Sequence, residues 1–293
     1  MIKSFKFRFL IITLATLSAS LAVSCKKNSE TESKQEDEVK THRIVSLHGA
    51  LTEMVAALGY EDQLVGVDVT STFPESIKGT AKDLGHVRSI TIESILELQP
   101  TLILAMERDL NSDLKEKIVT SGIEAYFYQQ KYALSATKNL IREIAGVLGS
   151  DKEEALIRQI DEDYSQVVRL DPKPKVLFIY ARGAGTLMVS GKNTPMQSII
   201  ELAGGTYSIT EFDDFKPLTP ESLIDSNPDV ILLFDSGLES LGGIEGLLQV
   251  PGVATTNAGK NKKIISMEGG FLSGFGPRVG KAAAQLNVLL KSE

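Results

Sequence analysis

The sequence has few of the side chains that cross-link a chain or bind a metal. Its only cysteine is Cys25, so no disulfide can form within the chain and stability has to come from the hydrophobic core. It has no tryptophan, and its three histidines, His42, His48 and His86, all lie in the first third of the 293 residues. A zinc or manganese capture site with imidazoles from both halves of the chain therefore cannot be assembled.

Two classes of function also lack support. The chain has many serines but no Gly-x-Ser-x-Gly elbow, and no cysteine besides Cys25, so it shows no motif of a catalytic nucleophile. Its formal net charge is −7, and no basic face is available to neutralise phosphates, which disfavours a nucleic-acid partner. An exported enzyme on an α/β scaffold stays as an alternative, but we find no catalytic constellation for it.

Residues 1–24 have the pattern of an export signal, with an apolar run too short for a comfortable membrane span. Three cations precede that run, namely Lys3, Lys6 and Arg8. Cys25 follows small residues in a pattern that resembles a bacterial lipobox, although Ala22 stands where leucine is more frequent. We expect Cys25 to be the lipidated first residue of the mature chain, and the alternative is a plain secretory signal with an incidental cysteine. Cleavage would move the net charge to −10.

Residues 25–41 combine the lipidated cysteine with a polar segment that contains a single valine. Such a segment cannot bury enough apolar surface to order itself, so we expect a flexible tether. The mature protein is then exported, anchored by lipid to the cell envelope and expected to act as a monomer.

Short β-rich runs alternate with helical patterns from residue 42 onward, which predicts parallel α/β sheets. The first lobe is expected over residues 42–134, connecting helices over 135–171, and the second lobe over 172–293. The expected strands are 42–47, 64–68, 101–105, 123–128, 175–180, 229–234 and 263–267. The expected helices are 51–58, 91–98, 114–121, 196–202, 220–226, 244–249 and 278–290.

Residues 135–171 contain no proline and carry charges at helical spacing. This pattern predicts one or two helices, the second of them crossing between the lobes. The run Pro100-Thr101-Leu102-Ile103-Leu104 is echoed by Pro228-Asp229-Val230-Ile231-Leu232, and this echo predicts two related Rossmann-like lobes. A ligand is expected between them, where parallel sheets present the loops at their carboxyl ends.

The run Arg182-Gly183-Ala184-Gly185 follows a strand and could open a dinucleotide fingerprint. The third glycine would fall at position 188, which is Met188, so a glycine-rich turn facing the cleft is the better interpretation.

The loop Leu84-Gly85-His86-Val87-Arg88 places an imidazole and a guanidinium two residues apart. A neutral imidazole can ligate a metal or haem iron, and a guanidinium can bind a carboxylate, so the pair suits a ligand that carries both. The alternative is an ordinary solvated histidine.

Four runs make the resemblance to a known family specific. They are Arg43–Leu47 with Thr52-Glu53, Lys216–Glu221, Gly237–Gly243 and Gly274-Phe275-Gly276-Pro277-Arg278. Over residues 42–290 the chain resembles the haem-binding proteins of bacterial haem ABC importers, which are related to corrinoid and siderophore binders. The resemblance implies the class III fold, two α/β lobes joined by a single long backbone helix, and a protein that hands haem to an ABC permease and its ATPase. A corrinoid or ferric-siderophore binder of the same fold is the alternative.

In that family a tyrosine of a Gly-Tyr-x-Arg loop commonly holds the iron, and this chain has Gly85-His86-Val87-Arg88 at the matching place. The resemblance therefore makes His86 the expected axial ligand, because histidine is itself an ordinary haem ligand. Arg88 is expected near the ligand or a propionate. His48, in the first strand-to-helix loop, is expected as a second ligand, as pocket wall, or as neither.

The remaining haem-binding candidates come from both lobes. Phe73 is either an apolar wall or a core residue, and Arg278 either meets a propionate or has a structural role at a helix start. The second lobe offers Tyr180, Arg182 and Met188.

Two glutamates are expected to dock the permease, as the resemblance implies one exposed glutamate in each lobe. Glu93 and Glu221 match those places, each in the first turn of an expected helix. A favourable interaction with the helix dipole is the alternative explanation for both.

Overall fold

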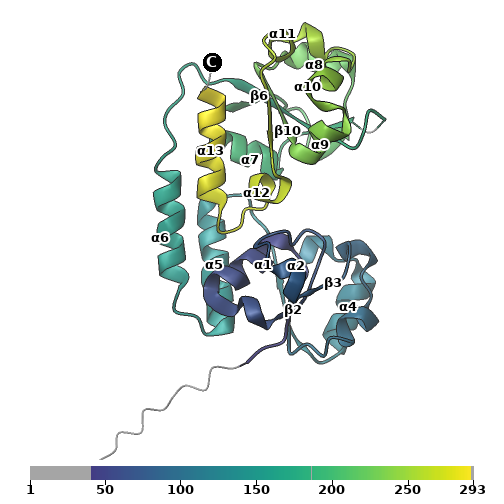
Figure 1. Cartoon of the computed structure of the whole chain (residues 1–293), viewed down its shortest axis with the longest axis vertical. Helices are drawn as coiled ribbons and strands as arrows, with labels where there is room; N and C mark the ends of the chain where they lie inside the picture. The colour runs from purple at the N-terminus through teal and green to yellow at the C-terminus, as the bar shows by residue number, and fades with distance from the viewer. Residues whose placement is uncertain (1–40, 186, 292–293) are drawn as a thin grey trace, which may run out of the picture. The chain divides into compact units, whose positions relative to one another are not determined.

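The computed structural model describes residues 41–185 and 187–291, all of which belong to one compact unit. The predicted signal peptide, the predicted lipidation site at Cys25 and nearly all of the predicted tether lie outside the described residues. No helix within the described residues is long and apolar enough to span a membrane. The described chain is an α/β structure with two sheets (Figure 1), as the sequence predicts.

The sheet of the N-terminal lobe has the order β3-β2-β1-β4-β5, and all of its pairs are parallel. Its strands are β1 (Ile44–Ser46), β2 (Leu64–Val67), β3 (Lys82–Asp83), β4 (Leu102–Met106) and β5 (Glu124–Tyr128). Every residue of β4 is buried, which is the continuous apolar pattern of a strand covered on both faces. Only β3, two exposed residues at the sheet edge, has no counterpart in the predicted strands.

Helices cover this sheet and connect its strands. They are α1 (Gly49–Val55), α2 (Ile77–Thr80), α3 (Ile92–Leu96) and α4 (Ser112–Thr120), with the short turns η1 (Ala56–Tyr60), η2 (Glu61–Gln63), η3 (Val87–Ser89) and η4 (Glu107–Asp109). The chain leaves β1 toward β2 and β3 on one side and later adds β4 and β5 on the other. The strand order therefore reverses between β1 and β4, where α/β sheets open a crevice for ligands.

The sheet of the C-terminal lobe has the order β11-β10-β6-β7-β9, with β8 beside β6. Its strands are β6 (Lys175–Ala181), β7 (Leu187–Ser190), β8 (Thr206–Tyr207), β9 (Phe215–Pro217), β10 (Val230–Phe234) and β11 (Ile264–Met267). The sequence predicts β6, β10 and β11 but misses the other three. β7 runs antiparallel to β6, so the turn at Arg182–Gly185 leads into a strand and the weak dinucleotide interpretation is excluded by topology.

The helices of this lobe follow the predicted positions closely where the pattern is long. They are α7 (Pro195–Leu202), α8 (Pro220–Ser226), α9 (Asp235–Ser240), α10 (Gly243–Leu248), η5 (Val253–Thr255), α11 (Asn257–Lys260), α12 (Gly269–Ser273) and α13 (Val279–Lys291). The sequence prediction misses α9, α11 and α12, which are short.

Two helices connect the sheets, α5 (Leu134–Leu148) and α6 (Glu153–Tyr164). Gly149 ends α5 in a left-handed conformation with φ of 73°, where a side chain would be strained. Since α6 has 12 residues, it is about 18 Å long, and an irregular segment continues from it to β6. Figure 1 shows α6 beside α13, and a Cβ at Gly280 would lie only 2.3 Å from the carbonyl oxygen of Ile160. Gly280 therefore allows the close packing of these two helices.

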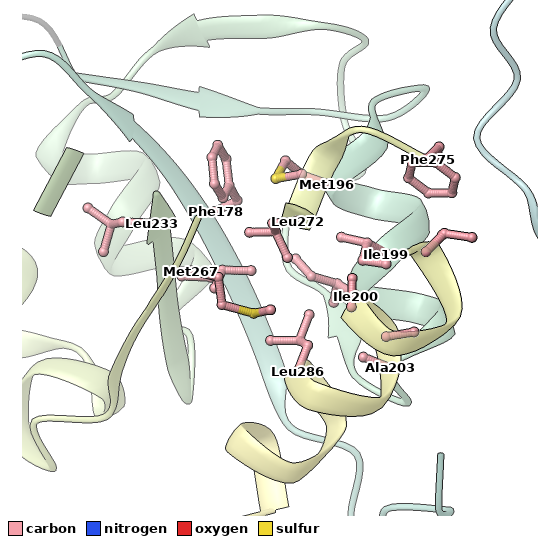
Figure 2. Packing of buried hydrophobic residues seen from close by; sticks show 14 of the residues in the cluster. Phe178, Met196, Ile199, Ile200, Ala203, Leu233, Met267, Leu272, Phe275 and Leu286 are labelled. Atoms are coloured by element: carbon pink, nitrogen blue, oxygen red, sulfur yellow. The ribbon is translucent and has the colours of Figure 1, made fainter. Parts of the chain in front are cut away.

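A large apolar core lies under α7, α12 and α13 (Figure 2). Phe178 of β6 is fully buried and meets the ring of Phe234 edge to face, with centroids 4.8 Å apart. Phe275, just after α12, is also buried and packs on the ring of Tyr132, which comes from the segment before α5. The segment between α12 and α13 is thus anchored in the core.

Candidate ligand-binding cleft

A cavity of about 400 Å³ lies between loops of the two lobes. The N-terminal lobe contributes His48, Glu53 and Thr72, and the C-terminal lobe contributes Arg182 and Glu268. His48, Thr72, Arg182 and Glu268 come from the loops after β1, β2, β6 and β11, and Glu53 comes from α1, the helix after β1. The cavity therefore lies at the carboxyl ends of these strands. This is the location that the sequence predicts for a ligand.

His48 caps the N-terminus of α1 and faces this cavity. Its Nδ1 accepts a hydrogen bond from the backbone N–H of Ala50 at 3.1 Å, and its Nε2 lies 3.8 Å from a carboxylate oxygen of Asp109. Burial lowers the pKa of His48 below its ordinary value, while the charges of Asp109 and Asp68 oppose that effect. His48 is therefore neutral at pH 7 with its proton on Nε2, the ring nitrogen nearer Asp109.

A buried hydroxyl network fixes the loop beneath His48. Asp68 accepts hydrogen bonds from the hydroxyls of Thr70 at 2.7 Å and Ser71 at 2.9 Å. Thr70 Oγ1 in turn accepts from the backbone N–H of Gly49 at 2.9 Å, and Ser71 Oγ lies 2.7 Å from Thr52 Oγ1. A buried carboxylate needs such partners, and this network joins the loop after β2 to the start of α1.

His86 is exposed and caps η3, with Nδ1 accepting from the backbone N–H of Arg88 at 3.2 Å. Its Nε2 therefore carries the proton and points away from that cap. His86 is not among the residues that line the 400 Å³ cavity, but the carbonyl of Gly85 accepts from the N–H of Val69 at 2.9 Å. The predicted ligand loop thus lies directly beside the loop that carries Thr70 and Thr72. Arg88 is exposed and forms no ion pair with another described residue.

Arg278 is bound to Glu53 by two hydrogen bonds, from Nε to Oε2 at 2.8 Å and from Nη2 to Oε1. Its guanidinium also lies 3.9 Å from the ring centroid of Phe73 and 5.1 Å from that of Phe271. The sequence leaves a propionate contact and a structural role open for Arg278, and these contacts support the structural role. Phe73 is 44% exposed, so the core alternative for this residue is wrong.

Burial raises the pKa of Glu53, and the hydrogen bond and charge of Arg278 oppose the rise. Glu53 belongs to α1 and Arg278 precedes α13, so the pair joins the two lobes beside the cavity. A neighbouring cavity of about 660 Å³ is lined by Phe73, Phe271 and Arg278, and Thr72 and Glu268 line both cavities.

The other candidates of the C-terminal lobe lie on β6 and β7. Tyr180 is directly opposite Met188 in the antiparallel pair, and its ring packs on Phe234 and Phe215. The guanidinium of Arg182 lies 5.6 Å from the Tyr180 ring centroid. Of these three candidates, only Arg182 lines the 400 Å³ cavity.

Glu93 and Glu221 both lie in the first turn of a helix and are exposed, as predicted. A backbone hydrogen bond at its own position and then the hydroxyl of Thr91 lower the pKa of Glu93. Neither glutamate forms an ion pair with another described residue, so both carboxylates are available to a partner.

Sequence reasoning missed Asp109, Glu268 and the pair formed by Arg108 and Asp214. Glu268 follows β11 directly and Asp109 comes three residues after β4, which is a positional signal that the sequence does contain. The pair of Arg108 and Asp214 has no such signal, because its members are 106 residues apart and meet only through tertiary structure.

Comparison with known proteins places the chain in a family. The periplasmic heme-binding protein RhuT from Roseiflexus sp. RS-1, in its apo form, superposes with a TM-score of 0.81 at 36% identity, covering 85% of this chain and 98% of RhuT. The periplasmic heme-binding protein BhuT in complex with two hemes gives the same TM-score at 30% identity, covering 85% of this chain and 97% of BhuT. The vitamin B12-binding protein of Yersinia pestis (strain Pestoides F) is 26% identical over 254 residues, 83% of this chain and 84% of that protein.

These relatives are binding proteins rather than enzymes, and the two-lobed α/β structure is the class III fold that the sequence predicts. The model of the periplasmic binding protein family matches residues 44–269, which include both sheets and the cleft between them. The chain belongs to the periplasmic binding protein family.

Proposed function

We propose that this protein captures haem in the cleft between its lobes and delivers it to an ABC permease with its ATPase. The observation that carries the proposal is the likeness to heme-binding RhuT, at 36% identity over 98% of that chain. The 26% identity with a vitamin B12-binding protein favours a corrinoid as the second candidate. The protein would bind its cargo without transforming it.

The chemistry of the cleft suits haem. His48 offers a neutral imidazole, which is the form that binds iron, and Arg182 offers a cation for a propionate. Arg278 is committed to Glu53. Arg182 and Arg88, which forms no ion pair within the described part of the chain, are therefore the better propionate partners. Phe73, exposed beside the cleft, supplies an apolar face that a porphyrin can cover.

We assign the iron to His86, with His48 as the second candidate ligand or a wall of the pocket. Both rings use their Nδ1 as an acceptor from a backbone N–H, so Nε2 is the nitrogen left for the iron in each case, although Nε2 of His48 lies 3.8 Å from a carboxylate oxygen of Asp109. Ligation through Nε2 requires the proton on that atom to leave or to move to Nδ1. In the second case the backbone N–H of Arg88 loses its acceptor, so the cap of η3 has to rearrange.

The decisive experiment is a titration of residues 26–293 with hemin, followed by absorbance in the Soret region, beside a parallel titration with cyanocobalamin. We expect a saturable Soret shift with hemin and no saturable binding of cyanocobalamin. Tight cyanocobalamin binding without a saturable hemin shift would replace the first candidate by the second.

The ligand is then tested with His86→Ala and His48→Ala in the same titration, with Arg88→Ala as a control that keeps both imidazoles. We expect His86→Ala to change the bound Soret spectrum and Arg88→Ala to weaken binding without changing the spectrum. If the spectrum of His86→Ala matches the wild type while that of His48→Ala changes, the iron ligand is His48.

Two further roles belong to the proposal. Cys25 is lipidated and anchors the protein. Labelling with a palmitate analogue in cells that express the wild type or Cys25→Ser tests this role, and equal labelling of the two proteins would exclude the anchor.

Glu93 and Glu221 dock the permease, and the double alanine variant should lose haem uptake while its hemin titration stays unchanged. Lost hemin binding in that variant would contradict the docking role.

A further inference from the structure

The helices that carry Glu93 and Glu221 share more than the position of a glutamate. Each begins with a threonine cap, Thr91 and Thr219, whose Oγ1 accepts from the backbone N–H of the serine three residues on, at 3.3 and 3.2 Å. The hydroxyl of that serine donates back to the carbonyl of the same threonine at 2.8 and 2.9 Å. The first turns of α3 and α8 therefore have the same local structure.

The two helices are also equivalent in the fold. α3 leads into β4, which pairs with β1, the first strand of its sheet. α8 leads into β10, which pairs with β6, the first strand of the other sheet. In both cases the residue before the connecting proline has a positive φ, 48° at Gln99 and 33° at Asn227. The lobes thus present one surface element twice.

One turn beyond each glutamate, this element exposes a large aliphatic side chain. Leu96 is 43% exposed and Ile224 is 51% exposed, and both lie three residues after their glutamate, on the same side of the helix. The residue just before each of them, Ile95 or Leu223, is fully buried. Each helix therefore buries one side, and Leu96 and Ile224 are the positions where an apolar residue is exposed beside a carboxylate that forms no ion pair with another described residue.

We propose that Leu96 and Ile224 form the apolar half of a duplicated docking surface, each with its glutamate, and that the partner is the two-fold symmetric membrane part of the importer. A duplicated surface fits a partner that also presents its own surface twice. The carboxylates call for a cation on each half of that partner, and the aliphatic residues call for an apolar depression beside the cation. This inference rests on the proposed function for the identity of the partner as an ABC importer.

Leu96 and Ile224 would add a binding contribution that salt does not screen, which the glutamates alone lack. An exposed ion pair contributes little net binding and is screened by salt, whereas buried aliphatic surface contributes without screening. Docking should therefore keep a salt-resistant component that depends on Leu96 and Ile224.

The test compares the double variant Leu96→Gln with Ile224→Gln against a control double variant, Val119→Gln with Val288→Gln. The control residues are even more exposed, 60% and 64%, and lie on α4 and α13. Glutamine keeps helix propensity close to that of leucine. Binding is measured for ligand-free and hemin-loaded protein on the cognate ABC importer reconstituted in lipid nanodiscs, at low and at high salt.

We expect the Leu96 and Ile224 variant to bind about tenfold more weakly, with the difference kept at high salt, and the control to bind within about twofold of wild type. Equal weakening by both variants, or wild-type binding by the first, would overturn the proposal. If the wild type binds empty nanodiscs as tightly as nanodiscs that contain the importer, the surface belongs to the membrane and the proposal is overturned. If sedimentation shows a wild-type dimer that the Leu96 and Ile224 variant does not form, the surface belongs to a second copy of the chain, which overturns the proposal as well. A wild-type protein that docks but gives no hemin shift would refute only the proposed cargo.

Discussion

Arg108 after β4 donates a hydrogen bond from Nη2 to Oδ1 of Asp214 before β9, over 2.8 Å, and so joins the two lobes. The two side chains are 71% and 62% exposed, in contrast to the pair of the half-buried Arg278 and the buried Glu53. Asp109, the next residue after Arg108, approaches His48 in the cleft. The turn η4 therefore contacts the opposite lobe with one residue and the candidate site with the next.

We predict that Arg108→Ala speeds hemin release with little loss of stability. An exposed ion pair contributes about 0–1 kcal/mol, so the free energy of unfolding should change by no more than that, while the lobes lose a link that restrains the cleft. Transfer of hemin to excess apomyoglobin, followed by stopped flow, should be about threefold faster at low salt, and the difference should vanish at high salt.

The control for this prediction is Arg142→Ala, which breaks the exposed pair of Arg142 and Glu154 within the connecting helices. It should leave the transfer rate unchanged. The exchange of charges, Arg108→Asp with Asp214→Arg, should restore slow release; a double variant as fast as Arg108→Ala would refute the restraining role of this pair.

We predict that Arg278→Met destabilises the protein by about 3–5 kcal/mol, because it leaves the buried carboxylate of Glu53 without a partner. Burial already raises the pKa of Glu53, and the variant removes the interactions with Arg278 that oppose the rise. A raised pKa in the folded state means that the stability is fully present below the unfolded pKa and falls as the pH rises through the folded pKa. Urea unfolding should therefore show that Arg278→Met loses more free energy of unfolding, relative to the wild type, at pH 8 than at pH 5.

Adding Glu53→Gln to Arg278→Met should recover part of that stability at pH 8, because the unpaired charge is removed. A double variant that is no more stable than Arg278→Met at pH 8 would show that the unpaired carboxylate of Glu53 is not the cause of the loss.

We predict that Gly49→Ala destabilises the loop under the cleft, by about 1–3 kcal/mol. A Cβ at Gly49 would lie 2.4 Å from the carbonyl oxygen of Thr70, a backbone atom, and would push apart the loops that place His48 and Thr70. Gly79→Ala is the matched control, because nothing lies within 4 Å of its Cβ. Thermal unfolding of both variants measures the difference, and equal melting temperatures would contradict the close packing.

We predict that His48 makes the ligand-free protein less stable as the pH falls below about 6.5. Burial lowers its folded pKa, so the unfolded chain binds the proton first and the stability present above the unfolded pKa is lost as the pH falls toward the folded pKa. His48→Asn keeps an N-cap acceptor and removes the titration. Urea unfolding between pH 7.5 and 5.5 should show a smaller loss for the variant, and an identical pH dependence would refute this role.

The sequence predicts the long, buried elements well. The apolar runs of β4, β6 and β10 and the helical repeats of α5, α7 and α13 are visible without structure, because burial on both faces or on one helix face leaves a clear period. It misses β3, β7, β8 and β9, which are two to four residues long and are strands only because a neighbouring strand supplies their hydrogen bonds.

For the candidate site, the sequence identifies candidate residues but does not show how they pair or which of them line the cavity. The sequence shows that His48 and His86 are the imidazoles available near a cleft, and that Glu93 and Glu221 each begin a helix. It does not show that Arg278 is committed to Glu53, 225 residues away, or that His48 lines the cavity while His86 is exposed beside it.

The sequence by itself determined the class of fold, the duplication of the lobes, the absence of internal disulfides and the resemblance to haem-binding proteins, because composition, local periodicity and short motifs carry that information. Only the tertiary structure decided which charges are paired across the lobes and which remain free. Arg278 and Arg108 each pair with a carboxylate of the other lobe, but Arg278 is half-buried against Glu53 and Arg108 is exposed to solvent on Asp214. That difference arises from contacts between residues far apart in the chain, which no local pattern specifies.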